Sequence, residues 1–329
     1  MEQPRRNTAI HQPRTADGTS LQSPVQPLLN QLKQKTAKTF KAADWKASAK
    51  IAEGSYAECF RNAKGQIIKL RPLQPDDKAL LSSAVCEAAI TMALNHLDHA
   101  NFVATSRIRV IRGPIPAALR QARQATIVAE KGYFLLIEQE DGGTELEGFN
   151  FTDDRQRFAT LQQVAFSLRK AEEAFKFEHR DLHLGNVLIA KTSETLQVFQ
   201  VAGHDFAVNT HGIRAVLIDF TLSRLEHQGE IFYTDLEADP ELFEGNMAPQ
   251  ASVYIASREV VRRNWANFAP QTNYMWLVSL AKNLLEKIDK KAHPAAANLL
   301  SFFRRKTTGA PTTLEGLLAH PVWAAFCAI

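Results

Sequence analysis

The sequence predicts an α+β fold of two lobes, in which a β-rich N-terminal lobe precedes a mainly α-helical C-terminal lobe. Three observations lead to this class. Short strand-like runs gather before residue 140, strong helical periodicity begins at residue 154, and Gly142–Gly143 interrupts the chain between these regions. We therefore expect the N-terminal lobe at about 45–140 and the C-terminal lobe at about 143–329.

In the N-terminal lobe, order is expected to begin near Trp45. Residues 51–60 and 65–70 flank a turn signal at 62–65, which predicts two short strands. Apolar residues recur at spacings of three and four through 76–97, so this segment is predicted to be a helix. The remaining elements expected in this lobe are strands at 103–111 and 133–137 and a short basic helix at 116–124.

In the C-terminal lobe, the clearest helical stripe runs from Asp154 to Phe177. The end of this helix leads directly into His179-Arg180-Asp181. The other elements expected here are two strands over 195–209 with a turn near Gly203, and helices at 273–289 and 295–305.

The composition is that of an ordinary soluble protein, with 45% hydrophobic and 22% charged residues. No apolar run approaches the roughly 18 residues that a membrane helix needs, and the N-terminus has no apolar signal core. The cysteines Cys59, Cys86 and Cys327 form no metal or disulfide pattern, which favours a reducing intracellular compartment.

The first 44 residues are predicted to be a mostly disordered basic tail, because they are rich in Gln, Pro, Thr and Ser without a sustained period. Residues 1–50 carry nine Lys/Arg and three Asp/Glu, and since the whole chain has a net charge of +4, the remainder is at −2. A solvated linker is the favoured interpretation, and a weak nucleic-acid or chromatin contact is the alternative.

Two segments carry the strongest functional signal. Residues 177–189 read FEHRDLHLGNVLI, in which Asp181 precedes Asn186 by five positions, and residues 216–225 read VLIDFTLSRL, an apolar strand that ends in Asp219. Phosphoryl transfer from ATP needs one carboxylate that orients the attacking hydroxyl, and an amide oxygen and a second carboxylate that hold the metal ions. The segments therefore predict a phosphotransferase, with Asp181 as the base or orienting group and Asn186 and Asp219 as metal ligands.

The N-terminal lobe contains the residues expected to contact the ATP phosphates. The segment around Gly54 lies where a glycine-rich phosphate loop is expected, with Ala52 and Ala57 in the places of the other two glycines. Lys69, in the next predicted strand, is expected to contact the α- and β-phosphates. Glu87, 18 residues further on in the predicted helix, is the best candidate for the carboxylate that orients Lys69.

Other polar residues near the predicted catalytic loop are assigned to the scaffold. His179 and Arg180 are expected to pack the loop and to hold the segment that follows Asp219. His183 is interpreted as structural, with a contact to the γ-phosphate as the alternative.

Two stretches are acidic and contain no Lys or Arg. Residues 138–147 include five acidic residues and residues 226–244 include seven. In a two-lobed phosphotransferase both stretches border the substrate cleft, where negative charge attracts a basic peptide. A solvated acidic loop is the alternative interpretation.

The two core motifs resemble those of the haspin family of atypical eukaryotic protein kinases. Haspins typically carry a His-Arg-Asp-Leu-His-x-Gly-Asn-Val-Leu loop, and they replace Asp-Phe-Gly by Asp-Tyr-Thr or Asp-Phe-Thr followed by Leu-Ser-Arg. Residues 179–188 and 219–224 match both patterns, and the resemblance covers about residues 45–325. Further similarities are the long insert between Asn186 and Asp219, residues 239–245, and Trp265 followed by 273–277.

The resemblance implies a bilobal protein kinase-like fold of the haspin type that uses ATP and Mg²⁺. It implies phosphorylation of a threonine near the N-terminus of histone three. By position, Lys69 and Glu87 match the ATP-orienting pair and Asp181 matches the base. Asn186 and Asp219 match the metal ligands.

The resemblance also implies positions for adenine and for the peptide. Glu140 and Gly142 fall at hinge positions whose backbone would meet adenine. Asp235, Asp239 and Glu241 fall where the family binds the basic histone tail. Ser252 and Ile255 depart from the family, which has an Asp and an Arg there, and this departure bears on peptide specificity.

Haspins are usually active without phosphorylation of the activation segment, and we expect the same here. Asp235 or Glu237 is expected to give Arg180 the negative charge that a phosphate supplies elsewhere. The resemblance further implies a nuclear protein, located on mitotic chromosomes, and we expect a monomer without membrane contact.

Two other classes of protein share parts of the pattern. A small-molecule kinase of the aminoglycoside or choline type has a similar loop and an Ile-Asp-Phe strand, but Arg180, the Thr-Leu-Ser-Arg run and the acidic segment argue against it. A pseudokinase that acts as a scaffold usually lacks the lysine, the base or the metal-binding Asp, and all three are present in this sequence.

Overall fold

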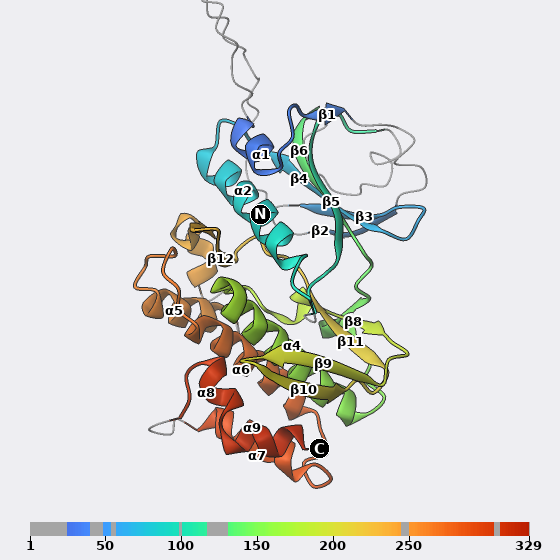
Figure 1. The fold of residues 1–329 in the computed structure, drawn as a ribbon, viewed down its shortest axis with the longest axis vertical. Coiled ribbons are helices and arrows are strands. Elements are labelled where there is room, and N and C mark those ends of the chain that lie inside the picture. Colours follow the sequence, from blue (N-terminus) through green and yellow to red (C-terminus); the bar gives the residue numbers. More distant parts are fainter. Residues whose placement is uncertain are drawn as a thin grey trace, which may run out of the picture.

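The computed structural model describes residues 25–39, 49–53, 57–98, 101–116, 131–244, 250–305 and 310–328. The fold is mixed α+β, with a β-sheet in the N-terminal part and mostly helices in the C-terminal part (Figure 1). This order confirms the α+β class and the sequence of strand-rich and helical regions that the amino-acid pattern predicted.

The N-terminal sheet has six strands in the order β1-β5-β6-β4-β3-β2. Its strands are β1 (Lys38–Thr39), β2 (Ala49–Glu53), β3 (Glu58–Arg61), β4 (Ile67–Leu73), β5 (Thr105–Pro114) and β6 (Lys131–Gln139). Strand β1 is parallel to β5, and the other neighbouring strands are antiparallel. Because β4 lies between β6 and β3, Lys69 pairs with Ile137 on one side and with Cys59 on the other, which fixes its position within the sheet.

Side chains of the sheet alternate between two packed faces. One face holds a cluster that includes Phe60, Leu70 and Phe134. The opposite face, which includes Leu135 and Ile137, packs on helix α2 (Lys78–Leu94). This helix begins after Asp77, whose side chain accepts the Leu80 N–H at 3.0 Å.

Residues 25–39 differ from the predicted disordered tail. Helix α1 (Gln26–Gln31) packs against α2, and Val25, Leu28 and Leu29 are buried between them and the sheet. The side-chain amide of Gln34 also pairs with the backbone of Val110, donating to its oxygen at 2.8 Å and accepting its N–H at 3.0 Å. The prediction of disorder is therefore wrong for this part, because a few apolar residues among Gln and Pro complete the sheet's core. Residues 1–24, which carry the rest of the predicted tail, lie outside the described residues.

The C-terminal part is built around α4 (Asp154–Phe175), which contacts α6, the β9–β10 hairpin and β11. The other helices are α5 (Gln250–Val260), α6 (Gln271–Glu286), α7 (Pro294–Arg304), α8 (Leu314–Leu318) and α9 (Pro321–Cys327). The strands are β7 (Thr144–Glu145), β8 (Val187–Lys191), β9 (Leu196–Val201), β10 (His204–Asn209), β11 (Ile213–Leu217), β12 (Arg224–His227) and β13 (Glu230–Tyr233). Short 3₁₀ turns are η2 (Leu146–Gly148), η3 (Leu184–Asn186), η4 (Leu236–Ala238) and η5 (Pro240–Phe243).

The longer predicted elements agree with the structure to within a few residues. The helices predicted at 76–97, 154–177, 273–289 and 295–305 correspond to α2, α4, α6 and α7. The strand predicted at 51–60 is divided between β2 and β3, and the helix predicted at 116–124 lies almost entirely outside the described residues. The sequence did not predict α1, α5, α8, α9 or the β12–β13 hairpin. In the described part of the chain, no helix has both the length and the apolar character needed to span a bilayer.

Glu172 generates a prediction about stability and pH. This residue of α4 is buried, and burial raises the pKa of its carboxyl from 4.5 to about 8, although Asn273 Nδ2 donates to Oε1 at 2.9 Å. In the unfolded chain the carboxyl ionises near its ordinary pKa, so the unfolded state is favoured progressively as pH rises from about 4.5 to about 8. We expect Glu172→Gln to be more stable than wild type at pH 8, by on the order of 3 kcal/mol, and nearly equal at pH 5.

Urea unfolding of both proteins at the two pH values measures this difference. Glu173→Gln is the matched control, because Glu173 is the adjacent carboxylate on the exposed side of the helix. A wild-type protein and a Glu172→Gln variant with the same dependence of stability on pH would contradict the prediction.

Candidate active site

The candidate catalytic loop begins where helix α4 ends. Lys176 has a left-handed backbone (φ 46°), and its N–H donates to Glu172 O at 2.8 Å. The chain then passes through the fully buried Phe177 into residues 178–181. The prediction that this helix leads directly into the loop is confirmed.

His179 connects the loop to the segment that ends in Asp219. Its Nε2 lies 3.1 Å from the backbone oxygen of Ile218, and its ring packs edge-on against Phe177 and Phe220. Burial lowers the pKa of His179 to about 4, so the ring is neutral at pH 7 and its Nε2 carries the proton that Ile218 O accepts. This geometry is that of a scaffold residue.

Arg180 is buried, and its guanidinium donates hydrogen bonds to one carboxylate and two backbone oxygens. Its Nε and Nη2 donate to the two carboxylate oxygens of Glu178 at 3.2 and 3.0 Å, and its Nη1 donates to Trp265 O at 2.6 Å. Nη2 also donates to Asn267 O at 2.9 Å. The left-handed backbone of Arg180 (φ 64°), which few residues other than glycine adopt, is held by these contacts.

The prediction that Asp235 or Glu237 supplies the negative charge beside Arg180 is therefore wrong. Glu178, two residues earlier in the same loop, supplies the negative charge. Glu237 instead forms an ion pair with Arg258 and accepts the Trp265 Nε1–H at 3.2 Å. Arg180 therefore has a fixed carboxylate partner without any phosphate on the chain.

Asp181 is held by two side chains from different parts of the chain. Asn186 Nδ2 donates to its backbone oxygen at 2.7 Å and to Oδ2 at 3.2 Å, and the hydroxyl of Tyr254 donates to Oδ1. Burial raises the pKa of Asp181 to about 7, while the Tyr254 hydrogen bond acts in the opposite direction. Hydrogen bonds to both carboxylate oxygens thus fix the orientation of the Asp181 side chain.

His183 shapes the turn between Asp181 and Asn186. Its Nδ1 accepts the N–H of Gly185 at 3.0 Å, and its Nε2 lies 3.2 Å from Asn186 Nδ2. These contacts agree with the structural interpretation, and a contact with the γ-phosphate stays a prediction.

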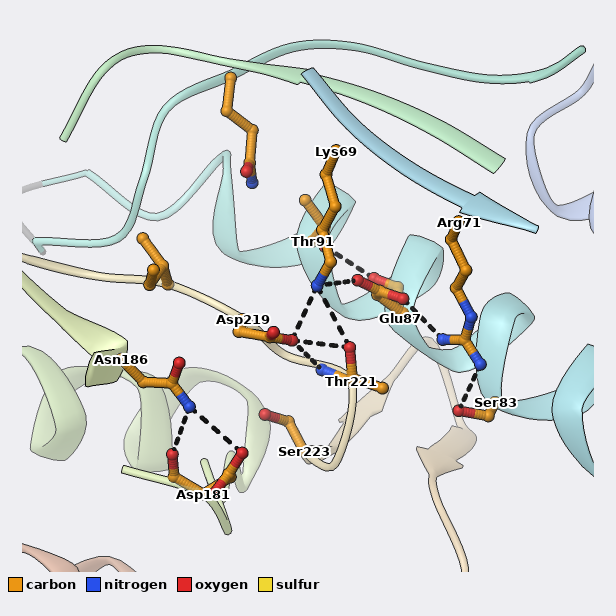
Figure 2. Close-up of polar contacts among 12 residues, drawn as sticks. Lys69, Arg71, Ser83, Glu87, Thr91, Asp181, Asn186, Asp219, Thr221 and Ser223 are labelled. Carbon is orange, nitrogen blue, oxygen red and sulfur yellow. Dashed lines mark hydrogen bonds and ion pairs between the residues drawn. The ribbon is translucent and has the colours of Figure 1, made fainter. Parts of the chain in front are cut away.

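Lys69 joins the sheet, helix α2 and the segment after β11 (Figure 2). Its Nζ lies 2.7 Å from Glu87 Oε1 and 2.8 Å from Asp219 Oδ1, and it donates to Thr221 Oγ1 at 3.3 Å. The expected ion pair with Glu87 is present. Burial alone would lower the pKa of Lys69, but the Asp219 and Glu87 carboxylates raise it above its usual range, so the amine is charged.

Glu87 has a second cationic partner that the sequence did not predict. Arg71 Nη1 lies 2.7 Å from Glu87 Oε2, and both side chains are buried. Burial would raise the pKa of Glu87, but Lys69 and Arg71 hold it below its usual range. Arg71 follows Lys69 by two residues in β4, so both side chains leave the same face of the strand, and this spacing was the available signal.

Asn186 and Asp219 lie at the paired ends of two strands. Val187 of β8 pairs with Leu217 of β11, and the Ile218 N–H donates to Asn186 O at 3.1 Å. This register places Asn186 and Asp219 at neighbouring strand ends, on the side of the lobe where Lys69 lies (Figure 2). Asp219 has a left-handed backbone (φ 61°), and burial would raise its pKa, but Lys69 and the Thr221 donors hold the carboxyl below its usual range.

Comparison with known proteins identifies the family. Residues 21–310 match the model of the haspin-like kinase domain. The chain belongs to the haspin-like kinase family. It is 27% identical over 277 residues to a serine/threonine-protein kinase haspin homolog of Drosophila melanogaster, covering 74% of this chain and 49% of that protein. The Arabidopsis thaliana haspin homolog is 29% identical (72% of this chain, 44% of that protein), and Mus musculus serine/threonine-protein kinase haspin is 28% identical (83% and 37%). The chain thus spans less than half the length of these relatives.

In this haspin-like chain, the expected phosphate loop is only partly described. Ala52 lies in β2 and is half-buried, whereas Gly54 lies outside the described residues. At the hinge, the Glu140 N–H donates to Ala104 O at 2.9 Å, which fixes the backbone there. Gly142 packs against β8 side chains, and a Cβ there would lie 2.7 Å from Leu188 Cδ1, so a side chain at this position would require the Leu188 side chain to move.

The acidic residues predicted for peptide binding lie on the segment after β13 of this haspin-like chain. Asp235 caps η4 by accepting the Glu237 N–H at 3.1 Å, and Asp239 ends the same turn. Both residues line a groove of about 380 Å³ between α2 and this segment, whereas Glu241 is exposed at the start of η5. The structure thus gathers the acids on one short segment.

Tyr254 and Glu178 were also missed by sequence reasoning. Tyr254 comes from α5, which was not predicted, although it lies between Ser252 and Ile255, the two positions at which the sequence departs from the haspin pattern. Glu178 lies directly beside the recognised His-Arg-Asp motif, so its position was the available signal. Glu178 also accepts the Ala269 N–H at 2.9 Å and the Thr272 hydroxyl at 2.6 Å.

Exchange of one carboxylate tests which acid holds Arg180. Glu178→Gln leaves a buried guanidinium without its counterion, so we expect it to lower the free energy of unfolding by about 3–5 kcal/mol. Glu237→Gln changes a pair that is partly exposed and should cost at most about 1 kcal/mol.

Urea unfolding of the two variants makes the comparison with matched chemistry, since each replaces one Glu by Gln. Equal losses in the two variants, or a larger loss in Glu237→Gln, would show that Glu178 is not the charge on which the loop depends.

Proposed function

We propose that this chain is an ATP-dependent serine/threonine protein kinase with the bilobal kinase-like fold of the haspin type. The observation that carries the proposal is the joint position of Lys69, Glu87 and Asp219 beside the Asp181–Asn186 pair. These groups come from β4, α2, the segment after β11 and the loop after α4, and their types are those that phosphoryl transfer from ATP requires. Membership in the haspin-like kinase family supports the same activity.

The residues fit a nucleotide with Mg²⁺. The Asn186 amide oxygen and the Asp219 carboxylate are hard oxygen donors of the kind that Mg²⁺ prefers, and Nδ2 of Asn186 is occupied by Asp181. Among the described residues, no group of three or more His, Cys, Asp or Glu could hold a metal ion. Bound Mg²⁺ would neutralise charge on the nucleotide phosphates.

The chain's own residues then have distinct roles. Lys69, oriented by Glu87, binds the α- and β-phosphates. Asp181 accepts a hydrogen bond from the substrate hydroxyl and orients it toward the γ-phosphate. The remaining contacts to the nucleotide are assigned to Ala52 and Gly54 over the phosphates, and to the backbone of Glu140 and Gly142 at adenine.

The presence of these groups argues against the alternatives. A pseudokinase scaffold would be expected to lack the lysine, the base or the metal-binding Asp. A small-molecule kinase has no need of a buried Arg180–Glu178 pair behind the loop or of an acidic segment after β13.

For the substrate, we propose a basic histone three N-terminal tail that presents a threonine. Support comes from the relatives named haspin and from Asp235, Asp239 and Glu241 on one short segment. A nuclear location, chromatin contact through residues 1–44 and a monomeric state belong to the same proposal.

Loss of the metal-binding carboxylate provides the first test. Asp219→Asn should reduce phosphoryl transfer at least on the order of a thousandfold, because several kcal/mol of transition-state stabilisation depend on this ligand. Lys69→Ala should have a similar effect. The measurement is transfer of radiolabelled phosphate from ATP to histone three, its tail peptide and a generic basic peptide, with circular dichroism to verify folding. Normal turnover by folded Asp219→Asn protein would refute the assignment.

Charge reversal on the acidic segment tests the substrate. Asp239→Lys combined with Glu241→Lys should raise the KM for the tail peptide at least about tenfold, which corresponds to about 1.4 kcal/mol. The KM for ATP should change little, because the phosphates are bound elsewhere. The wild-type peptide KM should also rise with salt. An unchanged peptide KM in the double variant would mean that these acids form only a solvated loop.

A further inference from the structure

We propose that Ser83 and Thr234 form a hydroxyl relay that holds helix α2 on the activation segment and thereby positions Glu87 for Lys69. The proposal rests on the proposed kinase function, in which Glu87 orients Lys69. Ser83 and Thr234 are positioning residues, since they act through Arg71 and Thr221 rather than on the reacting atoms.

The first half of the relay lies within the N-terminal part. Ser83 precedes Glu87 by one helical turn, so both side chains lie on the same face of α2. One guanidinium bridges them, because Arg71 donates from Nη1 to Glu87 Oε2 at 2.7 Å and from Nη2 to Ser83 Oγ at 3.0 Å (Figure 2). The same Nη2 donates to Leu80 O at 3.3 Å.

The second half crosses to the activation segment. Thr234 follows β13, and its hydroxyl donates to the backbone oxygen of Thr221 at 2.6 Å. The oxygen of that hydroxyl lies 3.3 Å from Ser83 Oγ. A parallel contact lies one turn along α2, where Cys86 Sγ is 3.1 Å from Tyr233 O.

The direction of the hydrogen bonds follows from the number of protons. Each hydroxyl has one proton to donate. Since the short bond to Thr221 O uses that of Thr234, Ser83 donates to Thr234 and accepts from Arg71. The chain of donors thus runs from a cation to a carbonyl oxygen, an order in which each bond polarises the next.

The relay completes a closed ring through the candidate active site. Thr221 Oγ1 donates to Asp219 Oδ1 at 2.6 Å, Asp219 binds Lys69, and Lys69 binds Glu87. Arg71 then returns the path to Ser83. The members from the sheet and α2 are buried, as is Thr221, whereas Asp219 and Thr234 are half-buried. The hydrogen bonds of Arg71 to Glu87 and Ser83 are therefore shielded from water, and those of Thr234 lie at the groove between α2 and the segment after β13.

The ring offers a physical reason for activity without phosphorylation. In many kinases a phosphate on the activation segment supplies the charge that orders this region. Here the Thr234 hydroxyl donates to the Thr221 backbone, the Thr221 hydroxyl is bound by Lys69 and Asp219, and the buried Ser223 hydroxyl donates to His179 O at 2.9 Å. The position of α2 is fixed by contacts that the unmodified chain already makes.

The test removes the hydroxyl without changing the shape of the side chain. Thr234→Val should lower kcat about tenfold, the effect of losing roughly one hydrogen bond in the active arrangement, whereas Thr234→Ser should retain wild-type kcat. Ser83→Ala should match Thr234→Val, and the double variant should lose little more, since both changes break the same chain. The peptide KM should stay unchanged.

Thr160→Val is the matched control. Thr160 is buried on α4, and its hydroxyl donates to Gln156 O at 2.8 Å, so the variant loses a hydrogen bond remote from the ring. Its kcat should equal that of wild type. Independent, additive losses from Ser83→Ala and Thr234→Val, or a normal kcat in Thr234→Val, would overturn the relay while leaving the kinase assignment intact.

Hydrogen exchange decides the proposal even if the wild-type protein phosphorylates none of the peptides, an outcome that would count against the proposed function. Amides of α2 should exchange about tenfold faster in Thr234→Val than in wild type or Thr160→Val, while α4 stays protected. Equal exchange of α2 in all three proteins would overturn the relay.

Discussion

The ion pairs of Lys69 with Glu87 and Asp219 are the interaction on which the rest of the site depends. They join β4, α2 and the segment after β11, elements that are separated by as many as 150 residues in the chain. A single buried ammonium between two carboxylates would leave an excess of negative charge in a region of low dielectric. Arg71 corrects this imbalance, since it binds the second oxygen of Glu87, and the four side chains together are electrically neutral.

A second buried charge pair supports the catalytic loop from behind. Glu178 accepts hydrogen bonds from Arg180, the Thr272 hydroxyl and the Ala269 N–H, so a single carboxylate connects the loop to the first turn of α6 and to the residues just before it. Asn273 of α6 adds a further connection, because its Oδ1 accepts the His179 N–H at 2.9 Å. The left-handed backbone of Arg180 persists because these contacts outweigh its conformational cost. These contacts fix the backbone on either side of Asp181, which favours precise orientation of its carboxylate.

The sequence predicted the parts of this site that local pattern encodes. Lys69, Glu87, Asp181, Asn186 and Asp219 could be found because their types and spacings follow the chemistry of phosphoryl transfer, and the long helices could be found from their apolar periodicity. Helix α1 could not be predicted, since it is short and its few apolar residues become buried only when they pack on α2 and the sheet. The partners Tyr254 and Thr234 depend on the three-dimensional approach of distant segments, and no spacing rule encodes such contacts.

The position of Arg180 shows why a correct motif can still suggest a wrong partner. The acidic segment after β13 contains several carboxylates, and any of them could be imagined beside Arg180 from the sequence alone. Glu178 is favoured because it is adjacent in the loop and fully buried, so its pairing with Arg180 orders few additional side chains. The acids of the segment remain at its surface or in the groove with α2, where Asp235 directly follows Thr234. One short stretch thus carries both the hydroxyl that fixes α2 and the charges available to a basic peptide. The acids and the hydroxyl have separate contacts, because the carboxylates face the groove or solvent and the Thr234 hydroxyl faces Thr221 and Ser83.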